Sequence, residues 1–209
     1  MARLCRVHFV GLGESCARFH PLTLDLRHPK TGVAQESVIW LRNGGGKTTL
    51  ISLLYSVLIP NQNYFLGRLL GRPTSLADFL RPNELAAMLT EWEFPTLGTP
   101  KRIVGQLVQL KDRDMKRRFF SFYAIPEFGF EHVGLFGLGT PGRSMDAVLD
   151  QLREAERRHG GRMDLVIPGD DQTQWEKHLE ERGLDPFLFR LHLKMNKQDR
   201  SLARSRGGN

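Results

Sequence analysis

Apolar and polar residues alternate in several short runs of the chain, the pattern of half-buried β-strands. Two runs, residues 4–10 and 22–26, lie near the N-terminus. Three more, residues 87–94, 102–110 and 119–125, follow one another and are separated by short polar or turn-forming segments. Consecutive strands with short connections favour antiparallel pairing, so the sequence predicts an antiparallel sheet over residues 87–125.

The pattern around residue 45 is different. Residues 37–41 are apolar on both faces, which predicts a central strand of a sheet that is covered on both sides. A glycine run follows, and then a helix is predicted from Lys47, in which residues 50–59 form an almost continuous apolar stretch that ends before Pro60. This stretch predicts a helix buried beneath a sheet, because a helix that is apolar nearly all round has no solvent-facing side.

The C-terminal third predicts helices. Ser144 is placed to cap a helix that runs to about residue 159, and residues 171–182 form a second helix closed by Gly183. Residues 186–194 begin a third. Residues 61–82 predict irregular structure with one short helix, residues 127–142 a glycine-rich loop, and the basic residues 197–209 a disordered tail.

Composition narrows the class of protein. The chain has 209 residues, 40% hydrophobic and 25% charged, which is ordinary for one globular domain. The net charge of +7 favours polyanionic partners. We therefore expect possible contact with duplex DNA through the basic residues of one segment: Lys101, Arg102, Lys111, Arg113, Lys116, Arg117 and Arg118.

Other chemistry is poorly supported. Cys5 and Cys16 form no C-x-x-C motif, and the seven histidines show no metal or triad spacing. Glu91 and Glu93 share one face of a predicted strand, which indicates a solvent-facing side. The start of the chain lacks the apolar core of a signal peptide, and its longest apolar stretch is too short to span a bilayer. We expect a cytoplasmic, nucleoid-associated protein with no membrane contact.

The glycine run carries the strongest chemical signal. It lies between a predicted strand and a predicted helix, the context of a phosphate-binding (Walker A) loop. Glycines allow backbone amides to turn around a phosphate, and the helix N-terminus adds a partial positive charge. A lysine can then contact the β- and γ-phosphates, and a threonine hydroxyl can ligate Mg²⁺. The residues with these roles are Asn43, Gly44, Gly45, Gly46, Lys47, Thr48 and Thr49.

At two places the sequence departs from known nucleotide-binding motifs. Leu41 stands where the usual loop has its first glycine, so the entry to the loop differs. An earlier glycine segment, residues 11–16, suggests a dinucleotide-binding turn, but Cys16 replaces the third glycine and Pro21 follows at once. We interpret residues 11–16 as the loop of a hairpin.

Five stretches together resemble a known family: residues 17–26, 40–47, 65–67, 91–93 and 183–190. They are similar to uncharacterised bacterial SMC-like ATP-binding proteins, whose phosphate loop commonly reads Arg-Asn-Gly-Gly-Gly-Lys. More broadly, the order of elements resembles the N-terminal lobe of the ABC-class ATPase heads of SMC, SbcC, RecF and RecN proteins. The resemblance implies an α/β P-loop NTPase lobe over residues 1–196, with an antiparallel β subdomain and C-terminal helices.

The same resemblance implies a mechanism. ATP and Mg²⁺ would bind the loop of one head, with Thr48 as a metal ligand and Gln198 as the metal-supporting glutamine. A second half-head, or a second copy, would clamp the nucleotide in DNA-associated processes such as chromosome maintenance, repair or phage defence. The family's signature segment and its apolar strand ending in Asp-Glu do not occur in this chain. We therefore expect a fragment that binds ATP and hydrolyses it only with the missing C-terminal lobe.

Two alternatives remain open. Asn196-Lys197-Gln198-Asp199 matches the pattern by which GTPases recognise guanine, although no Asp-x-x-Gly follows the loop. The chain could also be a basic DNA-binding module in which the loop is vestigial. The nearest imitation of the missing acidic strand, residues 165–171, is interrupted by Pro168 and Gly169, so we interpret it as a turn.

Overall fold

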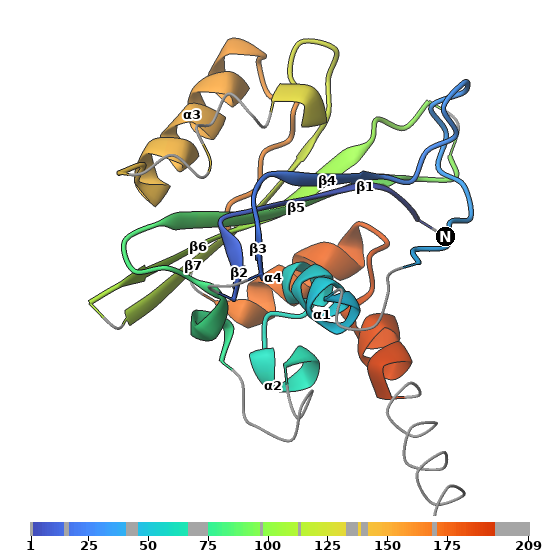
Figure 1. Ribbon diagram of the computed structural model, residues 1–209. Helices are drawn as coiled ribbons and strands as arrows, with labels where there is room; N and C mark the ends of the chain where they lie inside the picture. The colour runs from blue at the N-terminus through green and yellow to red at the C-terminus, as the bar shows by residue number, and fades with distance from the viewer. Residues whose placement is uncertain are drawn as a thin grey trace, which may run out of the picture.

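One antiparallel sheet contains five strands, in the order β4-β1-β5-β6-β7 (Figure 1). The computed structural model describes residues 2–14, 17–40, 46–66, 75–96, 98–112, 114–132, 138, 142–168 and 171–194. The strands are β1 (Arg3–Val10), β4 (Leu22–Asp25), β5 (Leu85–Glu93), β6 (Arg102–Lys111) and β7 (Asp114–Tyr123). The predicted antiparallel series in the middle of the chain is therefore confirmed, with β1 and β4 added beside it.

The strands β6 and β7 form a long, regular hairpin. Their register runs without a break from Arg102 opposite Tyr123 to Lys111 opposite Asp114. Asp112, with a positive φ of 50°, lies in the turn. Because no residue is inserted in either strand, side chains alternate strictly between the two faces of the sheet.

A second, two-stranded sheet consists of β2 (Leu12–Glu14) and β3 (Ala17–Phe19). Leu12 pairs with Phe19, and Gly13 pairs with Arg18. The segment after β1 is thus a hairpin in its own right and not the turn into a helix that dinucleotide binding requires. The interpretation of residues 11–16 as a loop is corrected at residues 12–14, which form β2.

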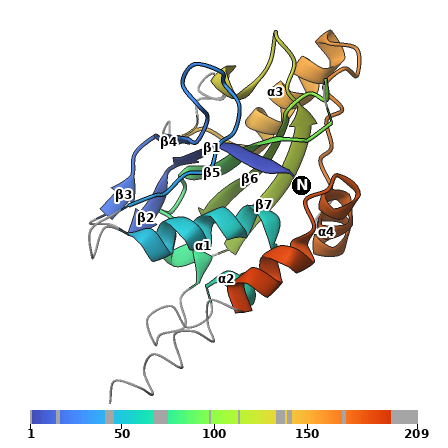
Figure 2. The ribbon, with the colours of Figure 1, turned by 90° about the vertical axis from the view of Figure 1, so that its right-hand side faces the viewer.

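Helices cover both faces of the larger sheet. The helices α1 (Lys47–Leu58), α2 (Gln62–Phe65) and α4 (Gln172–Glu181) lie on one face, together with the helical residues 186–194 (Figures 1 and 2). The helix α3 (Met145–Arg158) lies on the other face (Figure 1). A short 3-10 helix, η1 (Leu76–Phe79), precedes β5.

Each face has its own hydrophobic core. The core beneath α1 includes Phe9, Leu53, Met88, Val104 and Trp175. The core beneath α3 is formed by other residues of the same strands and by the apolar stripe of α3, including Leu89, Ile103, Phe120, Val148 and Leu152. Burial on both faces explains why the first five residues of β5, Leu85–Leu89, are all apolar.

The helix boundaries follow the predicted signals. The helix α1 ends at Leu58, just before Pro60. The Ser144 side chain accepts a hydrogen bond from the Ala147 amide and caps α3, and Asp171 caps α4 through the Thr173 amide. Gly183, with φ 73°, ends α4 in the left-handed conformation that favours glycine.

The prediction of a central strand at residues 37–41 needs a correction. Residues 37–40 form no strand, and Leu41 lies outside the described residues. Val38 and Trp40 are 94% and 84% exposed. The apolar pattern predicted burial, and this was wrong for the described residues 37–40, because no described strand of this chain pairs with the segment and its side chains are exposed.

The observed class is mixed α/β with an antiparallel sheet, in agreement with the coarser part of the fold prediction. Among the described helices, none is both long and apolar enough to cross a membrane.

Candidate functional site

The N-terminus of α1 is the candidate site. Gly46 precedes the helix in a left-handed conformation, with φ 76° and ψ 15°, and makes no side-chain cap. Lys47 is the first helical residue and is half-buried. The first intrahelical bond runs from the Leu50 amide to the Gly46 carbonyl, 2.8 Å away. The amides of residues 47–49 therefore precede the helical ladder and point along the helix axis, as anion binding requires.

The electrostatics of this end are favourable to an anion. The first turn of α1 contains no acidic residue. Its partial positive charge is therefore not compensated within the helix, in contrast to α3, which has Asp146 in its first turn. A phosphate group placed here would meet backbone amides and a lysine on the same helical turn.

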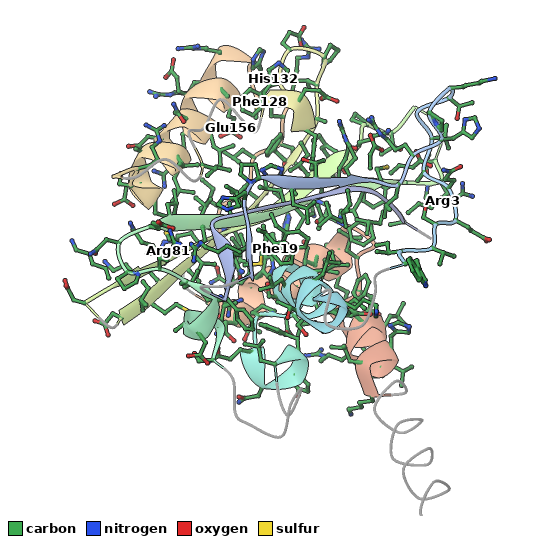
Figure 3. All side chains as sticks on the ribbon, viewed as in Figure 1. Arg3, Phe19, Arg81, Phe128, His132 and Glu156 are labelled. Atoms are coloured by element: carbon green, nitrogen blue, oxygen red, sulfur yellow. The ribbon has the colours of Figure 1, made fainter. Side chains whose placement is uncertain are left out.

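An aromatic ring lies beside this turn. Phe19 of β3 stacks on Phe9 of β1, with ring centroids 5.7 Å apart, and both rings pack into the core beneath the sheet (Figure 3). A Cβ atom built on Gly46 would lie 4.0 Å from the Phe19 ring, an ordinary contact. Glycine at this position is thus required by the backbone conformation and not by crowding.

The other predicted loop residues are described only in part. Asn43, Gly44 and Gly45 lie outside the described residues, and so does Gln198. Thr48 belongs to the first turn of α1 by its backbone, and Thr49 is half-buried beside it. Of the predicted set, the structure brings Gly46, Lys47, Thr48 and Thr49 together on one helix end.

The far end of α1 is held firmly in the core. The Trp175 indole of α4 donates a hydrogen bond of 2.9 Å to the Val57 carbonyl. The Tyr55 hydroxyl lies 2.5 Å from Nδ1 of His192 in the helical segment 186–194. Two C-terminal helices therefore fix the position of α1, so that its N-terminus is presented on a rigid element.

No strand is formed by the described residues of the predicted turn, 165–168 and 171. Val166 makes an isolated antiparallel bridge to Ser121 at the edge of β7. Asp171 caps α4, so its carboxylate is used by the helix. Asp170 lies outside the described residues.

The proposed basic DNA surface needs a correction at Arg102. This residue is fully buried, and its guanidinium donates to Ser121 Oγ over 2.8 Å and pairs with Asp164. The ring of Tyr123 lies 3.7 Å from the guanidinium carbon. A side chain enclosed in this way cannot contact a DNA phosphate, because desolvation and packing commit it to the interior.

The predicted DNA contact through Arg117 needs the second correction. It donates to the carbonyls of Pro60 and Ser56 and to the side chain of Gln106, and burial lowers its pKa to about 10. Gln106, itself fully buried, also donates to Ser56 Oγ, so its role is structural. Lys101 donates to the Gly32 carbonyl. Lys111 and Lys116 are exposed, Arg118 is half-buried and donates to the Arg117 carbonyl, and Arg113 lies outside the described residues.

Sequence reasoning missed a buried polar cluster between α4 and β7. His178 Nε2 lies 2.6 Å from Ser121 Oγ, which also accepts from Arg102. Burial, together with the nearby Arg182 and Arg102, lowers the pKa of His178 to about 4. The one available signal was the spacing of Trp175, His178 and Leu179, which places the histidine on the apolar face of its helix.

The interpretation of Glu91 as solvent-facing is wrong. Its carboxylate accepts two hydrogen bonds from Arg6, at 2.7 and 2.6 Å, and the two side chains are 3% and 8% exposed. The guanidinium of Arg6 also lies 4.4 Å from the centre of the Phe130 ring. The pair joins β1 to β5 on the side covered by the segment after β7.

Comparison with protein-family models and with curated proteins gives no match to this chain. Within the described part of the chain, no group of three His, Cys, Asp or Glu side chains could hold a metal ion.

Proposed function

We propose that this chain binds ATP at the N-terminus of α1, as the N-terminal part of an SMC-like ATPase head. The observation that carries the proposal is the left-handed Gly46 followed by Lys47 at the start of a rigid helix whose first turn has no acidic residue. A glycine-rich run directly before a lysine-headed helix is the arrangement that holds the phosphates of a nucleotide.

Under this proposal each residue has one role. The amides of residues 46–49 bind the phosphates, and the Lys47 ammonium neutralises their charge. The Thr48 hydroxyl would hold Mg²⁺ together with phosphate oxygens, with Gln198 as a supporting ligand. The nucleotide with its metal ion would lie between this chain and a second segment, and both would contact its charged groups.

The exposed segment 37–40 supports the need for that second segment. Val38 and Trp40 lie immediately before the loop, and their apolar side chains are almost fully open to water. Large exposed apolar groups beside a binding loop favour a partner surface. In the sequence, Pro168 and Gly169 interrupt the run that most resembles an apolar strand ending in acids, so we propose binding without efficient turnover by this chain alone.

Equilibrium binding of a fluorescent ATP analogue, with and without Mg²⁺, tests the proposal. Lys47→Ala is expected to weaken binding at least about tenfold, because it removes a charge-assisted contact. Lys30→Ala, which removes an exposed lysine elsewhere, is the matched control and should leave binding unchanged. Circular dichroism checks that both variants fold.

Two outcomes would contradict this function. Unchanged binding in Lys47→Ala would favour the vestigial loop. A clear preference for GTP that is lost in Asp199→Ala would favour the GTPase alternative through Asn196-Lys197-Gln198-Asp199.

A further inference from the structure

The outer edge of β7 carries a feature that nucleotide binding does not use. β7 is the last strand of the sheet, and β6 is its only neighbour in the strand order. The Ala124 amide donates inward to the Lys101 carbonyl, whereas the Ser121 and Tyr123 amides donate outward to Val166 and Met163. Since the register has no break, the odd-numbered residues of β7 direct their backbone groups away from β6.

The edge is paired along only half of its length by the described part of the chain. Residues 163–166 cover it at Ser121 and Tyr123. At Met115, Arg117 and Phe119 no described residue supplies a backbone partner, and the Arg118 side chain donates to the Arg117 carbonyl. An edge of this kind is a template for an added strand.

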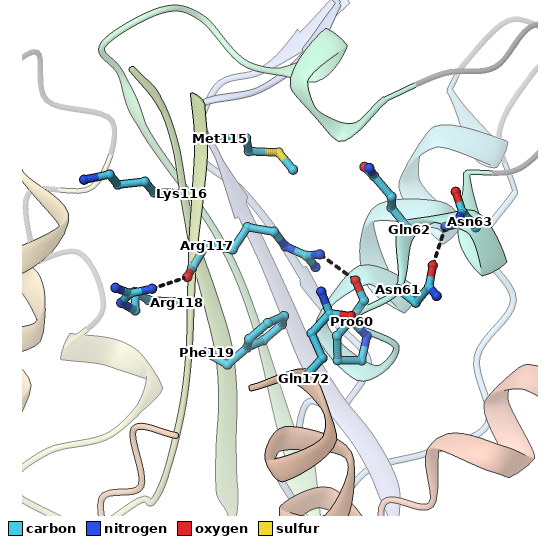
Figure 4. A pocket seen from close by; sticks show the side chains of 10 residues that line it. All are labelled: Pro60, Asn61, Gln62, Asn63, Met115, Lys116, Arg117, Arg118, Phe119 and Gln172. Carbon is cyan, nitrogen blue, oxygen red and sulfur yellow. Dashed lines mark hydrogen bonds between the residues drawn. The ribbon is translucent and has the colours of Figure 1, made fainter. Parts of the chain in front are cut away.

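A groove lies against the same part of the edge. It has a volume of about 680 Å³ and is lined from β7, from α2 and the residues before it, and from the start of α4. Met115, Arg117 and Phe119 point into it, and Gln62 and Gln172 lie across from them (Figure 4). Added strands run 4.7–4.9 Å from their neighbour, so alternate side chains of such a strand would reach this groove.

The positive charge of this edge indicates which kind of segment could bind to it. Lys116 and Arg118 lie on the opposite side of β7 from Arg117 (Figure 4), and the described groove lining contains no acidic residue. The nearest acids on the hairpin are Asp112 and Asp114, at its turn. A second copy of this chain fits badly, because antiparallel pairing centred on Arg117 would place each Lys116 opposite an Arg118, and opposed like charges destabilise a sheet.

We propose that the edge of β7 from Met115 to Phe119 binds an extended acidic peptide segment of another protein by strand addition. Its backbone pairs with the outward groups of Met115, Arg117 and Phe119. Its alternate apolar side chains enter the groove beside Met115 and Phe119, and its carboxylates lie beside Lys116 and Arg118 on the other side. Main-chain hydrogen bonds supply affinity, and the groove and charges supply specificity.

A synthetic peptide of alternating glutamate and valine tests this interaction on the full chain. Hydrogen exchange should show new protection at the amides of Met115, Arg117 and Phe119, while those of Lys116 and Arg118, already bonded to β6, change little. The control peptides replace every glutamate by lysine, or one central valine by proline. Both should bind at least about fivefold more weakly, since they lose the ion pairs or a ladder bond.

Two protein variants sharpen the test. Lys116→Glu, at an exposed position, should weaken the glutamate–valine peptide about fivefold and strengthen the lysine–valine peptide, whereas Lys30→Glu should do neither. Met115→Pro removes an outward amide without touching the β6 ladder and should reduce binding. Equal binding of the proline-interrupted peptide, or protection absent from the three amides, would overturn the proposal. So would duplex DNA that competes with the peptide and loses affinity in Lys116→Glu, because the edge would then be a phosphate surface.

Discussion

The imidazole of His178 lies 2.6 Å from the hydroxyl of Ser121, and this contact joins α4 to the edge strand β7. The same hydroxyl accepts a hydrogen bond from the buried guanidinium of Arg102, which pairs with Asp164. A neutral imidazole suits this position, because two arginines lie close to it and water is excluded.

Stability should therefore fall as pH decreases through this histidine's range. The folded pKa of about 4 lies below the ordinary 6.5, so between these values the unfolded chain binds a proton that the folded chain refuses. The contribution is fully present above pH 6.5 and is lost progressively down to about pH 4, to a total on the order of 3 kcal/mol. Urea unfolding from pH 7 to pH 4 measures it. The difference in unfolding free energy between wild type and His178→Gln should shrink by that amount, and a constant difference would contradict the prediction.

The ion pair of Arg6 and Glu91 should be costly to break from one side. Glu91→Gln removes the buried one of the two carboxylates that pair with the Arg6 guanidinium and leaves it only the exposed Glu131, so unfolding free energy should fall by about 3 kcal/mol. The double variant Arg6→Met with Glu91→Leu should lose less than the single change, because it leaves no unpaired charge. Glu131→Gln, at the exposed partner of Arg6, is the control and should cost under about 1 kcal/mol. A double variant that loses as much unfolding free energy as Glu91→Gln, or more, would contradict the prediction.

Gly105 of β6 lies directly under the ring of Phe120 on β7. A Cβ atom at this position would approach the ring to 2.3 Å, so Gly105→Ala should destabilise the protein by about 1–3 kcal/mol through overpacking. Replacing Phe120 by leucine in the same chain removes the clashing ring atoms and should recover part of the loss. Thermal unfolding of the two single variants and the double variant decides this. A neutral Gly105→Ala would mean that the ring moves aside freely.

Trp40 should report on the exposed segment before the loop. It is 84% exposed, whereas Trp92 and Trp175 are buried. Acrylamide should quench one component of the tryptophan fluorescence strongly, and Trp40→Phe should remove that component while changing stability by less than about 0.5 kcal/mol. Weak quenching in the wild type would mean that the segment is covered.

Local signals in the sequence predicted most of the elements. Alternation located four of the five strands of the sheet closely, and Ser144, Asp171 and Gly183 located the ends of their helices, because capping depends on a few neighbouring atoms. The start of β7 at Asp114 escaped notice because its first residues are charged on both sides of the strand. Edge strands tolerate such residues.

Whether a given side chain is buried or exposed could not be predicted in the same way. Residues 37–40 have the composition of a buried strand. A strand is buried only when another segment packs against it, and the pattern of apolar residues does not show whether the same chain provides that segment. Arg102 and Glu91 look like surface residues because charged side chains are rarely enclosed. Their burial depends on Asp164 and Arg6, which are distant in sequence. The glycine run predicted the helix end at Gly46 because its chemistry is local.

The place of β1 in the sheet has a consequence for synthesis. Phe9 pairs with Leu22 on one side, whereas Arg3 pairs with Glu93 on the other. A chain made from its N-terminus can therefore form the β1–β4 hairpin early, but the second side of β1 cannot be fully paired until residue 93 has left the ribosome. Until then the apolar side chains of Val7 and Phe9 have no finished core, so nascent chains paused before β5 are the form of this protein most in need of a chaperone.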